Sequence, residues 1–156
     1  YVAGLLHNVG MTLMNNLDSA RFEQVYELTE DGTSILDAEI EIYGANHAQL
    51  GMALVKKWEI DSMFGEAILA YMAPWEHPTI TKSANILASS IHLAQVIMDL
   101  AIFKNATGEA FPEEERDQLL EEFASHKAVV HIGWSAEELQ INIKKLEDVF
   151  IQDDTA

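Results

Sequence analysis

Apolar residues recur at intervals of three and four along most of this chain, and this spacing constrains the fold more than any other feature. Leu50, Leu54 and Trp58 lie on one side of a predicted helix, and His47 lies one step earlier on the same side. Runs that alternate apolar and polar residues, as a half-buried strand does, are absent. The pattern therefore predicts a compact, multi-helix, all-α domain in which His47 points towards the core.

Capping signals predict where several of these helices begin. Asp61 is placed to cap a helix over residues 63–72, and a long helix is expected from about residue 82 to residue 104. Ser135 precedes Glu138 by three residues, which is the spacing of a capping box at the start of the last helix.

The length of the chain, 156 residues, is that of one ordinary domain. We interpret residues 1–151 as a single helical domain and residues 152–156 as an acidic tail that frays. Tyr1 opens an apolar helical run with no initiator Met and no basic region of a signal peptide. We therefore expect an N-terminally truncated fragment.

Charge and composition exclude several classes of function. Lys and Arg number 9 against 26 Asp and Glu, which gives a net charge of −17 that repels phosphate backbones, so no nucleic-acid binding is expected. Polar side chains interrupt the most apolar stretch, residues 83–103, so no membrane span is expected. The absence of cysteine excludes disulfides and thiolate metal sites, and it fits a cytoplasmic location.

Histidines are the candidate metal ligands, but their spacing indicates no site. Neither His-Glu-x-x-His nor Glu-x-x-His occurs among the 6 histidines. His77 lies beside Pro78 in a predicted loop, and His126 and His131 lie near a helix end, where surface or capping roles are typical.

Four segments carry a resemblance to a known family. Residues 4–10 read Gly-Leu-Leu-His-Asn-Val-Gly, and residues 39–51 read Glu-Ile-Glu-Ile-Tyr-Gly-Ala-Asn-His-Ala-Gln-Leu-Gly. They resemble the Gly-Leu-Leu-His-Asp-Ile-Gly and Glu-x-x-x-Phe-Gly-x-x-His-x-x-x-Gly motifs of the HD superfamily, in its HDOD (HD-related output domain) branch. Residues 67–72 and 92–95 match later family segments in order, so the similarity covers residues 1–98.

The resemblance implies a helical fold whose catalytic members are phosphohydrolases that hold a divalent metal with histidine and aspartate. His7 and His47 are kept at positions matched to those ligands, but the remaining matched positions carry neutral or apolar side chains, namely Asn8, Tyr71, Met72 and Gln95. No anionic ligand remains among the matched positions. We therefore expect a degenerate site with no metal, no cofactor and no catalysis.

Structural roles are then predicted for His7, His47 and most large apolar residues. His7 and His47 are expected to be core residues, with Asn8 and Gln95 as candidate hydrogen-bond partners. The same interpretation places Trp58, Phe64 and Met72 in the core.

Recognition of a partner is predicted to use the surface instead. Trp75 lies in a predicted loop between Pro74 and Pro78, where a partly exposed indole ring is a candidate anchor. Acidic helix faces are the second candidate, at Glu113, Glu114 and Glu115 and at Glu121 and Glu122.

Our first hypothesis is a non-catalytic module of bacterial signal transduction or scaffolding that acts through protein contacts or ligand sensing. Its expected partners are proteins or a fused signalling domain, and a homo-oligomer is left open. The alternative is a divergent metal-dependent phosphohydrolase that takes extra ligands from the missing segment. A third hypothesis is a small-molecule receptor that uses the degenerate pocket.

Overall fold

The computed structural model describes residues 1–107, 127–135, 137–139, 141–142 and 145, without the side chains of residues 97–107 and 128. The chain divides into two compact units, Tyr1–Ile91 and His92–Ala156. Helices form the regular structure of both units, and the described ranges contain no strand. The all-α fold predicted from the three-four spacing is confirmed.

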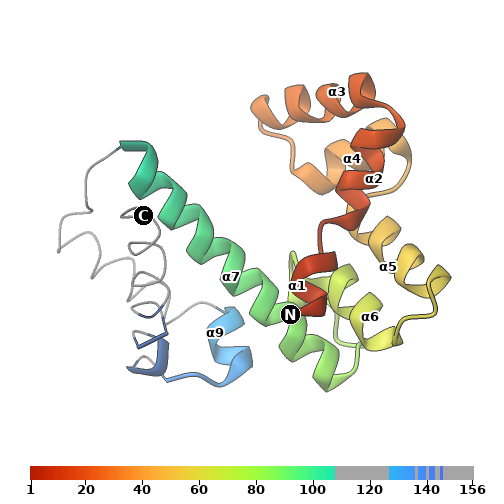
Figure 1. The fold of residues 1–156 in the computed structure, drawn as a ribbon. Helices are drawn as coiled ribbons and strands as arrows, with labels where there is room; N and C mark the ends of the chain where they lie inside the picture. The colour runs from red at the N-terminus through yellow and green to blue at the C-terminus, as the bar shows by residue number, and fades with distance from the viewer. Residues whose placement is uncertain (108–126, 136, 140, 143–144, 146–156) are drawn as a thin grey trace, which may run out of the picture. The chain divides into compact units, whose positions relative to one another are not determined.

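The first unit contains a succession of short helices (Figure 1). In chain order they are α1 (Val2–Leu6), α2 (Val9–Leu17), α3 (Ser19–Glu30), α4 (Ile35–Tyr43), α5 (His47–Lys57), α6 (Ser62–Ala70), the 3-10 turn η1 (Pro74–Glu76) and the start of α7 (Lys82–Thr107). Helix α5 contacts both α2 and α6, α1 packs against α6, and α3 packs against α4. Residues from α2 and α6 can therefore meet beside α5.

Side-chain caps explain where these helices begin. Asp61 accepts a hydrogen bond from the Met63 backbone N–H at 2.9 Å and begins α6, as predicted. Asn46 and Gln49 form a reciprocal capping box at α5, each side chain accepting from the other residue's backbone N–H. Gly44 ends α4 with a φ of 80°, a left-handed conformation that a side chain disfavours.

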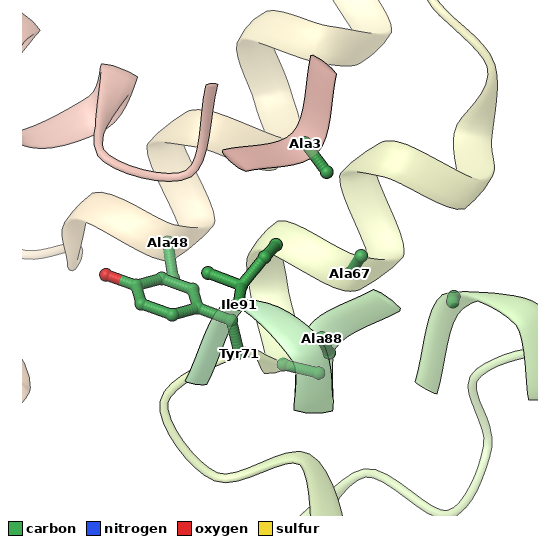
Figure 2. Close-up of a cluster of buried hydrophobic side chains, with 8 residues drawn as sticks. Ala3, Ala48, Ala67, Tyr71, Ala88 and Ile91 are labelled. Carbon is green, nitrogen blue, oxygen red and sulfur yellow. The ribbon is translucent and has the colours of Figure 1, made fainter. Parts of the chain in front are cut away.

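Small residues dominate the buried core of the first unit. Six alanines of α1, α5, α6 and α7 surround two larger side chains, Tyr71 and Ile91, and Figure 2 shows this cluster. Alanine lets helix backbones approach closely, because its side chain occupies little space between them. Tyr71 is only 1% exposed, although its hydroxyl is polar, so that hydroxyl needs partners inside the unit.

A polar corner joins α3 to the end of α4. The Arg21 guanidinium donates to the Ile42 carbonyl and lies 5.1 Å from the centre of the Tyr43 ring. The Tyr43 hydroxyl donates to the Asp18 carbonyl at 2.9 Å. Burial, together with the nearby charge of Asp18, raises the pKa of Tyr43 above its ordinary 10.0.

The second unit has its own apolar cluster. Leu93 of α7, Val129 of α9 (Lys127–Ile132) and Leu139 are buried there, with Trp134 packed against them. Ser135 and Glu138 form the predicted capping box: the Glu138 N–H donates to Ser135 Oγ at 3.2 Å, and the Ser135 N–H donates to Glu138 Oε2 at 2.8 Å. The Ser135 hydroxyl also donates to Glu138 Oε2, at 3.0 Å. The two bonds that this carboxylate accepts, from the Ser135 N–H and from the Ser135 hydroxyl, lower the pKa of Glu138 below its ordinary 4.5.

Two sequence predictions differ from the observed fold. Trp58 was predicted to be in the core, but it is 48% exposed, because α5 ends at this residue and the apolar side of the helix ends with it. The predicted loop at Pro74 contains the turn η1, since proline suits the first position of a helical turn. No helix among the described residues has the length and apolar character that a membrane span requires.

Candidate functional site

His47 begins α5 and is completely buried. Its backbone N–H donates to Glu39 Oε2 at 2.8 Å, and its ring Nδ1 lies 2.6 Å and 2.8 Å from the two oxygens of the same carboxylate. One acidic side chain thus holds both the main chain and the ring of His47, which fixes the orientation of the imidazole.

Glu39 lies on the inner side of α4, where it and Ala38 are the buried residues. Its carboxylate is 0% exposed, and it faces the first turn of α5. The first N–H groups of a helix have no partner within the helix, and the helix dipole favours a negative charge there. The buried carboxylate therefore serves both the N-terminus of α5 and the imidazole ring.

Tyr71 extends this arrangement to the first helices of the chain. It follows the last residue of α6, and its hydroxyl oxygen lies 2.6 Å from His47 Nε2. The same hydroxyl donates to Asn8 Oδ1 at 3.0 Å. We call the connected side chains Glu39, His47, Tyr71 and Asn8 the polar chain. Every buried side-chain nitrogen and oxygen among the described residues has a hydrogen-bond partner.

The other predicted site residues lie around the polar chain in different ways. His7 Nδ1 lies 2.6 Å from the Gly4 carbonyl oxygen, and the His7 ring meets Tyr71 edge-on at 5.2 Å between ring centres. Met72 packs against the alanine-rich cluster instead of joining the polar chain. Gln95 lies on α7 within the second unit.

The donor atoms of the polar chain do not fit a divalent metal ion. Both ring nitrogens of His47 face protein groups, Nδ1 towards Glu39 and Nε2 towards the Tyr71 hydroxyl. A metal-bound imidazole needs one nitrogen lone pair directed at the ion. Among the residues that the structure describes, no three His, Asp or Glu side chains gather in a metal-binding arrangement.

A comparison with family models finds a match over the part of the chain that contains this site. Residues 1–74 match the HDOD domain. The resemblance inferred from the sequence motifs is confirmed over this range. No curated protein and no solved structure was found to match the chain.

The matched HDOD region contains the whole polar chain. Helices α1 to α6 and the residue that ends α6 all fall within it. The further similarity that we infer for residues 75–98 lies outside the matched range and stays a prediction.

Glu39 is the residue of the polar chain that was not predicted from the sequence. It opens the second family motif, eight residues before His47, but it was not among the residues matched to metal ligands. One signal was present: Glu39 is next to Ala38 on the side of α4 that has to face the core. An acidic residue on a buried face requires a partner, and a histidine at the next helix start is a suitable one.

The predicted recognition residues fall into two groups. Trp75 lies in η1, one residue beyond the range matched to the HDOD domain, and is half-buried. Glu113, Glu114, Glu115, Glu121 and Glu122 lie outside the described residues.

Proposed function

We propose that this chain is a non-catalytic module of bacterial signal transduction or scaffolding that acts through protein contacts. The observation that carries the proposal is the use of both His47 ring nitrogens by protein groups, Glu39 on one side and Tyr71 on the other. A hydrolytic metal centre needs open imidazole and carboxylate ligands to activate water. In the HDOD region these groups hold helices together instead.

Chemistry at the neighbouring positions supports the same role. Asn8 offers a neutral amide where the catalytic relatives of the family have an aspartate, and its oxygen is bonded to Tyr71. Met72 packs against the apolar cluster of the first unit. The Glu39 carboxylate is the anion closest to His47, and it is bonded to both the ring and the backbone N–H of that residue.

Trp75 is the side chain that we assign to partner binding. The half-buried indole ring of Trp75 leaves part of its apolar surface exposed, and a partner can bury that area. Trp58 offers a matched control, since it is 48% exposed at the end of α5.

Two measurements on the full chain test the proposal. Elemental analysis after dialysis is expected to find no stoichiometric Mg, Mn, Fe or Zn, and phosphomonoester and phosphodiester hydrolysis with added Mn²⁺ is expected to stay at background. A tightly held metal that is lost in His47→Ala, together with hydrolysis that depends on it, would establish the phosphohydrolase alternative instead.

Partner capture from the native host tests the assigned surface. Trp75→Ala is expected to reduce recovery of a specific partner by about tenfold or more, as loss of an aromatic anchor does, while Trp58→Ala retains it. Recovery should persist in high salt, because apolar burial is screened far less than surface charge. Equal recovery by folded Trp75→Ala would move the binding surface away from η1.

A further inference from the structure

We propose that residues 56–61 form a self-association surface, through which two copies of this chain pair about Trp58 with opposite charges facing each other. We call these residues, which read Lys-Lys-Trp-Glu-Ile-Asp, the α5 end segment. The segment joins α5 to α6 within the HDOD region (Figure 1). A dimer formed here does not depend on the proposed function, because partner binding is assigned to Trp75 on a different element.

Trp58 is the apolar centre of the α5 end segment. It ends α5 and is 48% exposed, and within the described part of the chain its ring stacks on no other aromatic ring. Tryptophan has a large apolar area and is among the residue types that dominate binding at protein interfaces. Its exposure therefore marks a place where a second surface can bury a large apolar side chain.

Charges of opposite sign lie on the two sides of Trp58 in the sequence. Lys56 and Lys57 come directly before it, and the acids Glu59 and Asp61 follow it. All four side chains are exposed, and among the described residues none of them forms an ion pair, although Asp61 caps α6 with one carboxylate oxygen. The α5 end segment therefore has no net charge, in a chain whose net charge is −17.

This order of charges fits a second copy of the same segment. In a two-fold symmetric interface, a residue that contacts a different residue of the other copy is itself contacted by that residue's counterpart. Pairing about Trp58 therefore sets Lys57 of each copy against Glu59 of the other copy. The result is two equivalent ion pairs beside two indole rings, and the segment complements itself without any further partner.

The net charge of the chain favours a second copy over an acidic or a basic partner at this segment. An acidic partner is repelled by the overall charge of −17, and a basic partner would face Lys56 and Lys57. Two copies also repel each other at long range, but a segment with no net charge is where they meet with the least repulsion. At about 0.15 M salt, charges more than about 8 Å apart are largely screened, so the charges at the contact decide the pairing.

Glu59 has a backbone conformation that a side chain disfavours. Its φ is 57°, and among the described residues no other non-glycine residue has a positive φ. The Glu59 N–H donates to the Lys56 carbonyl at 3.2 Å, and the Ile60 N–H donates to the Val55 carbonyl at 3.1 Å, which are the bonds that close a helix at a left-handed residue. Glycine is the usual residue there. A carboxylate at a glycine position indicates a role beyond the fold of one chain, and pairing with Lys57 of a second copy is such a role.

Sedimentation equilibrium of the full chain tests the surface. We expect a reversible dimer between about 1 µM and about 1 mM protein, the range of weak protein interfaces, at about 0.15 M salt. Trp58→Ala should raise the dissociation constant about 30-fold or more, because it removes the apolar anchor. Tyr26→Ala, at a ring on α3 that is 50% exposed, is the matched control and should leave the dimer unchanged. Trp75→Ala should also leave it unchanged, which separates the dimer from partner binding.

Charge variants test the two-fold pairing itself. Lys57→Glu and Glu59→Lys should each raise the dissociation constant about tenfold or more, because like charges then face each other across the contact. When these two variants are mixed they should pair with each other, since one has acids on both sides of Trp58 and the other has lysines on both sides. The variant that carries both substitutions should dimerise like wild type.

Glu59→Gly separates the surface from the stability of the fold. Glycine suits the left-handed conformation, so this variant should resist denaturant at least as well as wild type, while its dissociation constant rises about tenfold. Three results would overturn the proposal: a wild-type chain that stays monomeric up to about 1 mM, which leaves the segment to another part of the chain or to another protein; a dimer that persists in folded Trp58→Ala; or single charge variants that do not pair when mixed. If Trp58→Ala does not fold, Glu59→Gly and the mixed charge variants decide.

Discussion

Gly10 of α2 lies directly against the main chain of His47: a Cβ atom added at Gly10 would stand 2.0 Å from the His47 carbonyl oxygen and 2.8 Å from its carbonyl carbon. The missing side chain lets α2 approach the first turn of α5. This approach brings Asn8, two residues before Gly10, close enough to reach Tyr71. The hydrogen-bonded site therefore depends on a residue that has no polar side chain.

Gly10→Ala is expected to destabilise the protein by about 3 kcal/mol or more, because the clash is with backbone atoms that cannot turn aside. Denaturant unfolding measures the change in the free energy of unfolding. Gly4→Ala is the matched control, since a Cβ there meets nothing within 4 Å and α1 gains from alanine by up to about 1 kcal/mol. Equal effects of the two variants would contradict the close packing of α2 on α5.

Glu39→Ala and His47→Ala are each expected to destabilise the protein by roughly 3–5 kcal/mol, because each leaves the other polar group buried without its partner. The double variant should lose less than the sum of the two, with a coupling free energy of about 0.5–3 kcal/mol. Chemical denaturation of the four proteins gives this value. Glu41→Ala, at an exposed acid of the same helix, should change stability by less than about 0.5 kcal/mol.

Tyr43 is expected to ionise above the ordinary tyrosine pKa of 10.0 when the pH is raised, because burial and the Asp18 charge raise its pKa. Because the pKa of Tyr43 is higher in the folded protein than in the unfolded chain, the neutral hydroxyl of Tyr43 stabilises the fold fully below about pH 10. This stabilisation is lost as the pH rises through the higher pKa of the folded state. Ultraviolet absorbance of tyrosinate, compared with Tyr43→Phe and Tyr26→Phe, assigns the late step. Tyr43→Phe should also cost about 1 kcal/mol at neutral pH through loss of the bond to the Asp18 carbonyl.

The capping box of Ser135 and Glu138 is expected to weaken in acid. Hydrogen bonds from Ser135 lower the pKa of Glu138 in the folded protein. The ionised Glu138 carboxylate therefore stabilises the fold above the ordinary pKa of 4.5, and this stabilisation is lost as the pH falls through the lower pKa of the folded state. The hydrogen-exchange protection of the Glu138 N–H should therefore drop in that range. In Glu138→Gln this acid-dependent drop should disappear, and Glu137→Gln, at the neighbouring exposed acid, should retain it.

Much of the architecture could be predicted from local sequence. Asp61 and the pair Ser135 and Glu138 begin helices at the predicted positions, because a cap depends on atoms within three residues of the helix start. The burial of His47 followed from its place on the apolar side of α5. The family motifs, which are also local in sequence, indicated the HDOD domain that the comparison confirmed over residues 1–74.

The partners of His47 could not be predicted in this way. Asn8 was expected to bond to a histidine directly, but it reaches His47 only through Tyr71, and Glu39 was not among the predicted site residues. Their meeting depends on how α2 and α6 pack against α5 and on the bond from Glu39 of α4 to the first residue of α5. Contacts such as Gly10 against the His47 carbonyl decide this packing. The sequence by itself determined which residues form helices and which sides of those helices are buried, because these depend on spacing and caps. Only the tertiary structure decided which buried polar atoms face one another, because a hydrogen bond requires its two atoms within about 3 Å, a condition set by the packing of whole helices.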